Sequence, residues 1–148
     1  MKLTWTCFNI ILWETNFVTI RKDGSMGVLN KSIGSYGESI AENYLKEMGY
    51  TILERNFKCK IGEIDIIAKD NKYICFVEVK TRYGSLYGSP GESVTNLKQY
   101  KINKTAQFYI LKKKLHKFSF RFDVIEVILN NEDDNYSIKL IKDAFQVS

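Results

Sequence analysis

Hydrophobic and polar positions recur with two different periods along this chain, and these periods predict the order of its elements. Apolar residues return to one helical face at 35–49 and again at 91–114, which predicts two helices. Alternating or short apolar runs predict five strands, at residues 50–57, 63–69, 72–80, 118–129 and 136–141. The order is therefore α-β-β-β-α-β-β with no internal repeat, and we expect an α/β fold with a mixed β-sheet flanked by helices.

Turn-forming residues mark the connections between these elements. A basic, glycine-containing turn is expected at residues 58–62, and Asp70-Asn71 predicts a hairpin between the second and third strands. Residues 81–90 carry two glycines and the single proline, which predicts a mobile loop before the second helix.

The beginning of the chain does not follow these patterns. Its apolar stretch at residues 8–13 is shorter than the apolar region of a signal peptide, and Glu14 follows where a cleavage site would lie. We interpret residues 1–32 as an extension outside the fold and residues 33–148 as the folded domain. A start codon chosen upstream of Met26 would explain the first 25 residues, and the sequence leaves open whether they are translated.

Composition narrows the chemistry that the chain can perform. It has no apolar run near the 18 residues of a membrane span, so we expect no membrane partner. Its three cysteines match neither a disulfide framework nor a paired zinc site, and Cys59 and Cys75 are most simply the reduced thiols of a cytoplasmic protein. A single histidine argues against a His-based zinc site and a Ser/His triad. Asp, Glu and Lys remain as candidates for chemistry.

Positive charge is concentrated in one segment. Residues 95–122 contain eight Lys and Arg residues and no Asp or Glu, although the whole chain has a net charge of only +5. Such a segment favours a polyanionic partner, and nucleic acid before membrane. A solvated helix face is the alternative.

Three charged residues are expected to meet on the predicted hairpin. Alternation puts Glu78 and Lys80 on one face of their strand, and the hairpin would bring Asp65 opposite or diagonal to Glu78. Two neighbouring carboxylates suit a hard cation, Mg²⁺ or Mn²⁺, with Lys80 orienting a water or balancing phosphate charge. The alternative is a cross-strand salt bridge of Lys80 with Asp65 or Glu78.

The spacing Asp65-x12-Glu78-Val79-Lys80 resembles the PD-(D/E)xK nuclease motif, with Ile64 in place of the usual proline. More closely, the chain resembles the YraN-type bacterial family of predicted endonuclease-like proteins, from about residue 33 to 127. The matching stretches are Gly34-x-x-Gly37-Glu38-x-x-Ala41-x-x-Tyr44-Leu45, Glu54-Arg55-Asn56-Phe57, Gly62-Glu63-Ile64-Asp65-Ile66-Ile67, Phe76-Val77-Glu78-Val79-Lys80-Thr81-Arg82 and Arg121-Phe122-Asp123-Val124.

The resemblance implies a restriction-endonuclease-like fold close to that of Holliday-junction resolvases, and an endonuclease-like domain acting on nucleic acid. It implies a metal-dependent nuclease, DNA being favoured over RNA, with Asp65, Glu78 and Lys80 as catalytic residues. Glu38 would complete the metal site as in resolvases; otherwise it closes a capping box with Ser35. A catalytically silent nucleic-acid-binding module on the same fold is the alternative function.

Further residues are candidates for contacts with nucleic acid. Lys98 and Gln99 match a Lys-Gln pair of the family at the start of the second helix, and Lys101 and Lys104 follow. Arg82 and Arg121 are candidates for phosphate contacts; the alternative for Arg121 is an ion pair with Asp123 or Glu126. The sequence leaves the oligomeric state open, a homodimer included.

Overall fold

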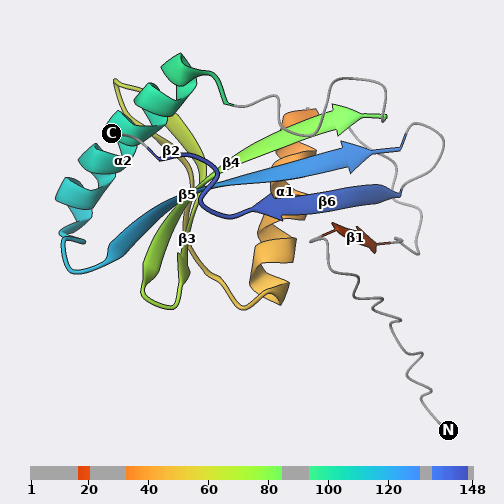
Figure 1. The fold of residues 1–148 in the computed structure, drawn as a ribbon, viewed down its shortest axis with the longest axis horizontal. Coiled ribbons are helices and arrows are strands. Elements are labelled where there is room, and N and C mark those ends of the chain that lie inside the picture. Colours follow the sequence, from red (N-terminus) through yellow and green to blue (C-terminus); the bar gives the residue numbers. More distant parts are fainter. Residues whose placement is uncertain (1–16, 21–32, 85–93, 131–134, 147–148) are drawn as a thin grey trace, which may run out of the picture.

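A six-stranded sheet with two helices makes up the described part of the chain (Figure 1). The computed structural model describes residues 17–20, 33–84, 94–130 and 135–146. The strands lie in the order β1-β6-β5-β4-β3-β2, with β4 and β5 parallel and the other pairs antiparallel. The elements are β1 (Phe17–Ile20), α1 (Ile33–Glu47), β2 (Thr51–Lys58), β3 (Glu63–Asp70), β4 (Tyr73–Tyr83), α2 (Asn96–Lys113), β5 (Ser119–Leu129) and β6 (Tyr136–Ile141).

From α1 onward, the element order and the mixed α/β architecture predicted from the sequence are confirmed. Most boundaries shift by one or two residues, and three differences change a loop, the start of a helix or a turn. The strand β4 continues to Tyr83, because it pairs with β5 as far as Leu129. The loop predicted at residues 81–90 therefore begins later. Residues 85–90 of that loop lie outside the described residues. The helix α2 begins at Asn96, since Thr95 is its N-cap. The hairpin reverses at Asn71 and Lys72, one residue later than expected.

The N-terminal segment contributes a strand that the alternation pattern did not predict. Residues 17–20 form β1, which pairs antiparallel with β6 at the edge of the sheet. These four residues were expected to lie outside the fold, and their pairing with β6 differs from that expectation. Residues 1–16 and 21–32 lie outside the described residues, so the rest of the expected extension and the start at Met26 stay predictions.

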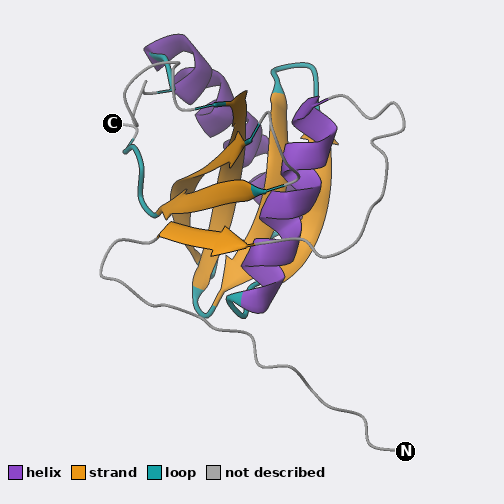
Figure 2. Cartoon of the chain, turned by 90° about the vertical axis from the view of Figure 1, so that its right-hand side faces the viewer, coloured by secondary structure: helices purple, strands orange, loops and turns teal. Residues whose placement is uncertain are grey.

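Figure 2 shows the two helices lying against the sheet. Each helix covers its own apolar cluster. The α1 cluster joins Ala41 and Leu45 to Ile66 and Val77, whereas α2 packs Ile102, Ala106 and Tyr109 with residues such as Phe76. Sheet residues on both faces are therefore buried, which explains the nearly continuous apolar runs in β3 and β4. No helix in the described ranges is long and apolar enough to cross a membrane.

The contact between α1 and β4 depends on a glycine. A Cβ added at Gly37 would lie 1.8 Å from Thr81 Oγ1, and Gly37 is itself buried. The helix therefore approaches the strand more closely than any side chain at residue 37 would allow.

We expect Gly37→Ala to lower the free energy of unfolding by about 1–3 kcal/mol, because the methyl group must displace Thr81 or the helix. The matched control is Gly34→Ala in the same helix, where an added Cβ meets nothing within 4 Å. Its stability should be unchanged or up to about 1 kcal/mol higher, since alanine favours helix. Urea unfolding of both variants measures the difference, and equal effects would contradict the close packing.

Candidate active site

The sheet opens at Asp65. The β3–β4 ladder runs from Asp70↔Tyr73 to Ile66↔Val77, after which β3 stays with β2 while β4 continues beside β5. At the point of separation, the backbone N–H of Val79 donates to Asp65 Oδ2 at 2.8 Å. The carboxylate thus accepts a backbone hydrogen bond from β4, and this holds Asp65 against the strand that carries Glu78.

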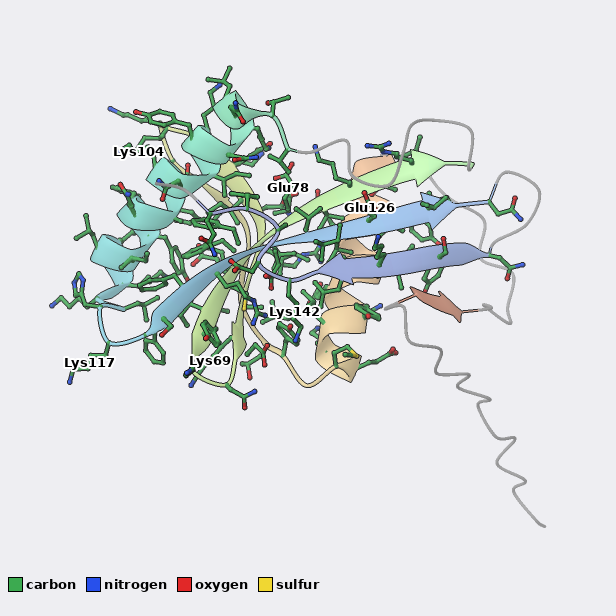
Figure 3. The ribbon with its side chains drawn as sticks, viewed as in Figure 1. Lys69, Glu78, Lys104, Lys117, Glu126 and Lys142 are labelled. Atoms are coloured by element: carbon green, nitrogen blue, oxygen red, sulfur yellow. The ribbon has the colours of Figure 1, made fainter. Side chains whose placement is uncertain are left out.

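Glu78 lies next to Asp65 in this opening, one step beyond the last pair of the ladder. Its side chain is 7% exposed, and its Oε1 lies 3.2 Å from Lys98 Nζ and 3.8 Å from Lys80 Nζ. Figure 3 shows Glu78 on β4 close to the beginning of α2, the helix that carries Lys98. The trio predicted on the hairpin is therefore joined by a second lysine from a distant part of the chain.

The two carboxylates affect one another electrostatically. Burial, then repulsion from Glu78, raises the pKa of Asp65 from 3.8 to about 6, although the Val79 N–H and Lys98 act in the opposite direction. A carboxylate pair that must be ionised together at neutral pH therefore carries an electrostatic cost, which a cation bound between the groups would relieve.

The donor set fits a magnesium-type ion. Glu78 Oε2 is buried and has no hydrogen-bond partner, which leaves a hard oxygen donor beside the Asp65 carboxylate. Within the described residues, however, no three acidic, His or Cys side chains gather closely enough to hold an ion. Two carboxylates, with water and substrate oxygens as the remaining ligands, match the usual coordination of Mg²⁺ rather than a closed protein cage.

Glu38 lies near this pair but has other partners. It accepts a hydrogen bond from Asn56 Nδ2 at 3.0 Å and lies 3.6 Å from an Arg55 nitrogen. Its charge contributes to the raised pKa of Asp65. The alternative role as a capping residue is wrong, because α1 already begins at Ile33 and Ser35 lies inside the helix. Glu38 as a metal ligand stays a proposal.

Asn56 is a site residue that sequence reasoning missed. It lies opposite Asp65, between the pairs Arg55↔Ile66 and Phe57↔Ile64, and has a left-handed φ of 49°. Asn tolerates this conformation better than most residues, and its amide holds Glu38. One feature of the sequence could have pointed to Asn56. It lies in the Glu54-Arg55-Asn56-Phe57 stretch that matches the family, and strand alternation does not explain this match.

Arg121 does not join the carboxylate pair. Its guanidinium contacts Asp123 at 2.8 Å, Asp70 at 3.1 Å and Tyr50 at 3.0 Å. Asp123 is fully buried and also accepts the backbone N–H of Asp143. The alternative predicted for Arg121, an ion pair with Asp123, is therefore confirmed. Arg121 has a structural role, because it connects Asp70 at the end of the hairpin to β5.

The remaining candidates divide between the site and the surface. Gln99 Nε2 donates to Val94 O at 2.7 Å and so anchors the segment before α2. Lys101 is exposed one turn after Lys98, and Lys104 lies over the Tyr100 ring at 5.6 Å. Arg82 is half-buried on β4, two residues after Lys80 and therefore on the same strand face.

We expect the contribution of Asp65 to the stability of the metal-free protein to fall as pH rises from about 4 to about 6, because Asp65 binds its proton more tightly in the folded than in the unfolded state. Asp65→Asn removes this cost. The variant should therefore be more stable than wild type by about 2 kcal/mol at pH 8, with a gain that shrinks toward pH 4. Urea unfolding in EDTA across this range measures it. A gain that does not change with pH would contradict the raised pKa.

These observations define a mixed α/β protein with a carboxylate pair where its sheet opens, flanked by two lysines. The pattern of the Uncharacterised protein family UPF0102 matches residues 37–127, which include Asp65, Glu78, both lysines and Glu38. The chain belongs to this family, and the YraN-type family predicted from the motifs is thereby confirmed.

Three relatives illustrate the similarity. The chain is 68% identical over 122 residues to a UPF0102 protein of Clostridium tetani (strain Massachusetts / E88). It is 67% identical over 123 residues to one of Clostridium botulinum (strain Loch Maree / Type A3), and 66% identical over 122 residues to one of Clostridium kluyveri. Each match covers 82% of this chain and the whole of the relative.

Proposed function

We propose that this protein is a metal-dependent nuclease of the restriction-endonuclease-like class, most simply a DNA endonuclease of resolvase type. The observation that carries the proposal is the juxtaposition of Asp65 and Glu78 at the opening of the sheet, with Lys80 beside them. A Mg²⁺ or Mn²⁺ ion held by the two carboxylates would supply Lewis-acid activation of the phosphodiester and of the attacking water.

The residues of the chain have separate roles in this proposal. Asp65 is held by the Val79 N–H so that its second oxygen can bind the ion, and Glu78 contributes the unpartnered Oε2. Lys80, one third exposed, orients the attacking water and balances charge that builds on the phosphate. Glu38 assists from α1, where Asn56 keeps its carboxylate in place.

One observation favours a second candidate, a nucleic-acid-binding module without turnover. Lys98 and Lys80 both lie within 4 Å of Glu78 Oε1, so the carboxylate has cationic partners even without a metal ion. In that case the lysines would serve phosphate binding, and the carboxylates would only position them.

The test is a cleavage assay on branched, flapped and linear DNA and on RNA, with Mg²⁺, with Mn²⁺ and with EDTA. The nuclease proposal expects cleavage with at least one metal ion and none in EDTA. Binding of nucleic acid without cleavage under every condition would select the silent module. Cleavage that survives both Asp65→Asn and Lys80→Ala would come from a contaminant and would overturn the assignment.

A further inference from the structure

A hollow of about 410 Å³ lies between the turn after β2 and the first half of α2. Two segments that are far apart in the sequence line it. One consists of residues 58–63, the turn and the first residue of β3, and the other contributes two lysines of α2. The lining residues are Lys58, Cys59, Lys60, Ile61, Gly62, Glu63, Lys98 and Lys101. Below, this is called the basic hollow.

The walls of the basic hollow are held together by close contacts. The turn is closed by the Cys59 N–H, which donates to the Gly62 carbonyl at 3.0 Å. A Cβ added at Gly62 would lie 3.0 Å from Thr105 Oγ1 and 3.6 Å from Lys101 Cβ. The turn therefore packs directly on α2, and Gly62 allows this close approach. The lysines are presented from a packed framework rather than from a loose loop.

The charge in the basic hollow is only partly neutralised. Lys58 pairs with Glu63 at 3.0 Å, and Lys98 pairs with Glu78. Lys60 and Lys101 are exposed and form no ion pair with any residue that the structure describes. Two cations thus remain to attract an anion.

Lys98 connects the basic hollow to the candidate active site. It lines the hollow, and its ammonium lies 3.2 Å from Glu78 Oε1. A polyanion with regularly spaced charges could therefore place one charge at the carboxylates and a neighbouring one in the hollow. A nucleic-acid backbone carries such a regular row of charges, whereas a single small anion would occupy one position only.

We propose that the basic hollow binds a backbone phosphate of DNA next to the phosphate that lies at Asp65 and Glu78. This inference rests on the proposed function for its substrate class, and it assigns the turn at residues 58–62 to substrate binding. Lys60 and Lys101 contact the flanking phosphate, and Lys98 lies between the two positions.

The experiment compares two charge-matched double variants. The hollow variant is Lys60→Gln/Lys101→Gln. The control is Lys72→Gln/Lys117→Gln, two exposed lysines near one another at the other end of the molecule, where Ser119 N–H donates to Lys72 O. Figure 3 shows Lys117 beyond the far end of α2 from Glu78. Binding of a short fluorescein-labelled DNA duplex is measured by anisotropy in EDTA over a salt series, after thermal unfolding has shown that both variants are folded.

The hollow variant should flatten the slope of log affinity against log salt by about one to two units, and the control by less than about half a unit. Equal changes in both variants, or none in either, would overturn the proposal. Because binding is measured in EDTA, the result does not depend on turnover. If the wild type never cleaves, the nuclease proposal fails, while a selective change in the hollow variant still supports this phosphate site.

Discussion

Asp65→Asn should abolish nuclease activity, lowering the cleavage rate by about 10³-fold or more, while DNA binding is kept or tightened. The amide still accepts the Val79 N–H but loses the charge that would hold the metal ion. Each tenfold in rate corresponds to about 1.4 kcal/mol, and the loss of Lewis-acid activation is worth several kcal/mol. Binding should not weaken, because the substitution removes a negative charge that faces the backbone of the substrate. Single-turnover cleavage and anisotropy measure the two quantities separately.

The matched control for this prediction is Glu63→Gln. Glu63 belongs to the same strand, two residues earlier, but its side chain is half exposed and paired with Lys58. With enzyme in saturating excess, so that any effect of Glu63 on binding in the basic hollow does not alter the rate, its cleavage rate should stay within about threefold of wild type, since surface ion pairs contribute little. A loss in Glu63→Gln as large as in Asp65→Asn would contradict the assignment of Asp65 as the metal ligand.

Lys80→Ala should lower the cleavage rate by about 10²- to 10³-fold, the usual cost of removing one preorganised donor from a developing charge. Its ammonium lies 3.8 Å from Glu78 Oε1 and is one third exposed, so it can reach a substrate phosphate or water. The affinity for DNA should fall only slightly, because a single surface cation contributes little to the total charge. Cleavage under single-turnover conditions measures the rate, and anisotropy in EDTA measures the affinity.

Lys69→Ala is the control for Lys80→Ala. Lys69 is also a half-buried lysine on a strand, and its ammonium lies over the Phe118 ring at 5.2 Å. We expect its rate to match that of wild type. If Lys98→Ala abolishes cleavage and Lys80→Ala does not, the role assigned to Lys80 is wrong and belongs to the lysine nearer to Glu78.

Strand alternation was sufficient to predict the trio because Asp65, Glu78 and Lys80 all belong to one local hairpin. Period two assigns each side chain to a face, and a two-residue turn leaves little freedom in the register. The same reasoning predicted the order of the elements from α1 to β6. It did not predict β1, whose four residues are too few for a clear pattern.

Contacts between distant segments could not be predicted in the same way. Lys98 reaches Glu78 because α2 crosses over the sheet between β4 and β5, and helical periodicity does not say which strand end the helix will meet. Asn56 has a left-handed backbone within a strand, which no alternation pattern indicates. The capping-box interpretation of Glu38 failed because Ser35-x-x-Glu38 also occurs inside a helix that starts earlier.

The parallel pairing of β4 with β5 sets the order in which the parts of the site can assemble during folding. Tyr73 pairs with Ser119 and Tyr83 with Leu129, so this ladder joins segments separated by the whole of α2, whereas Asp65 and Glu78 lie on a hairpin with a short turn. Contacts of high sequence separation form slowly, because the intervening chain must first be closed into a loop. The two carboxylates can therefore come together while the chain is still partly folded, and Lys98 joins them only when the crossover closes. The neutralising cation thus arrives only with a long-range step, which ties completion of the site to formation of the β4–β5 ladder.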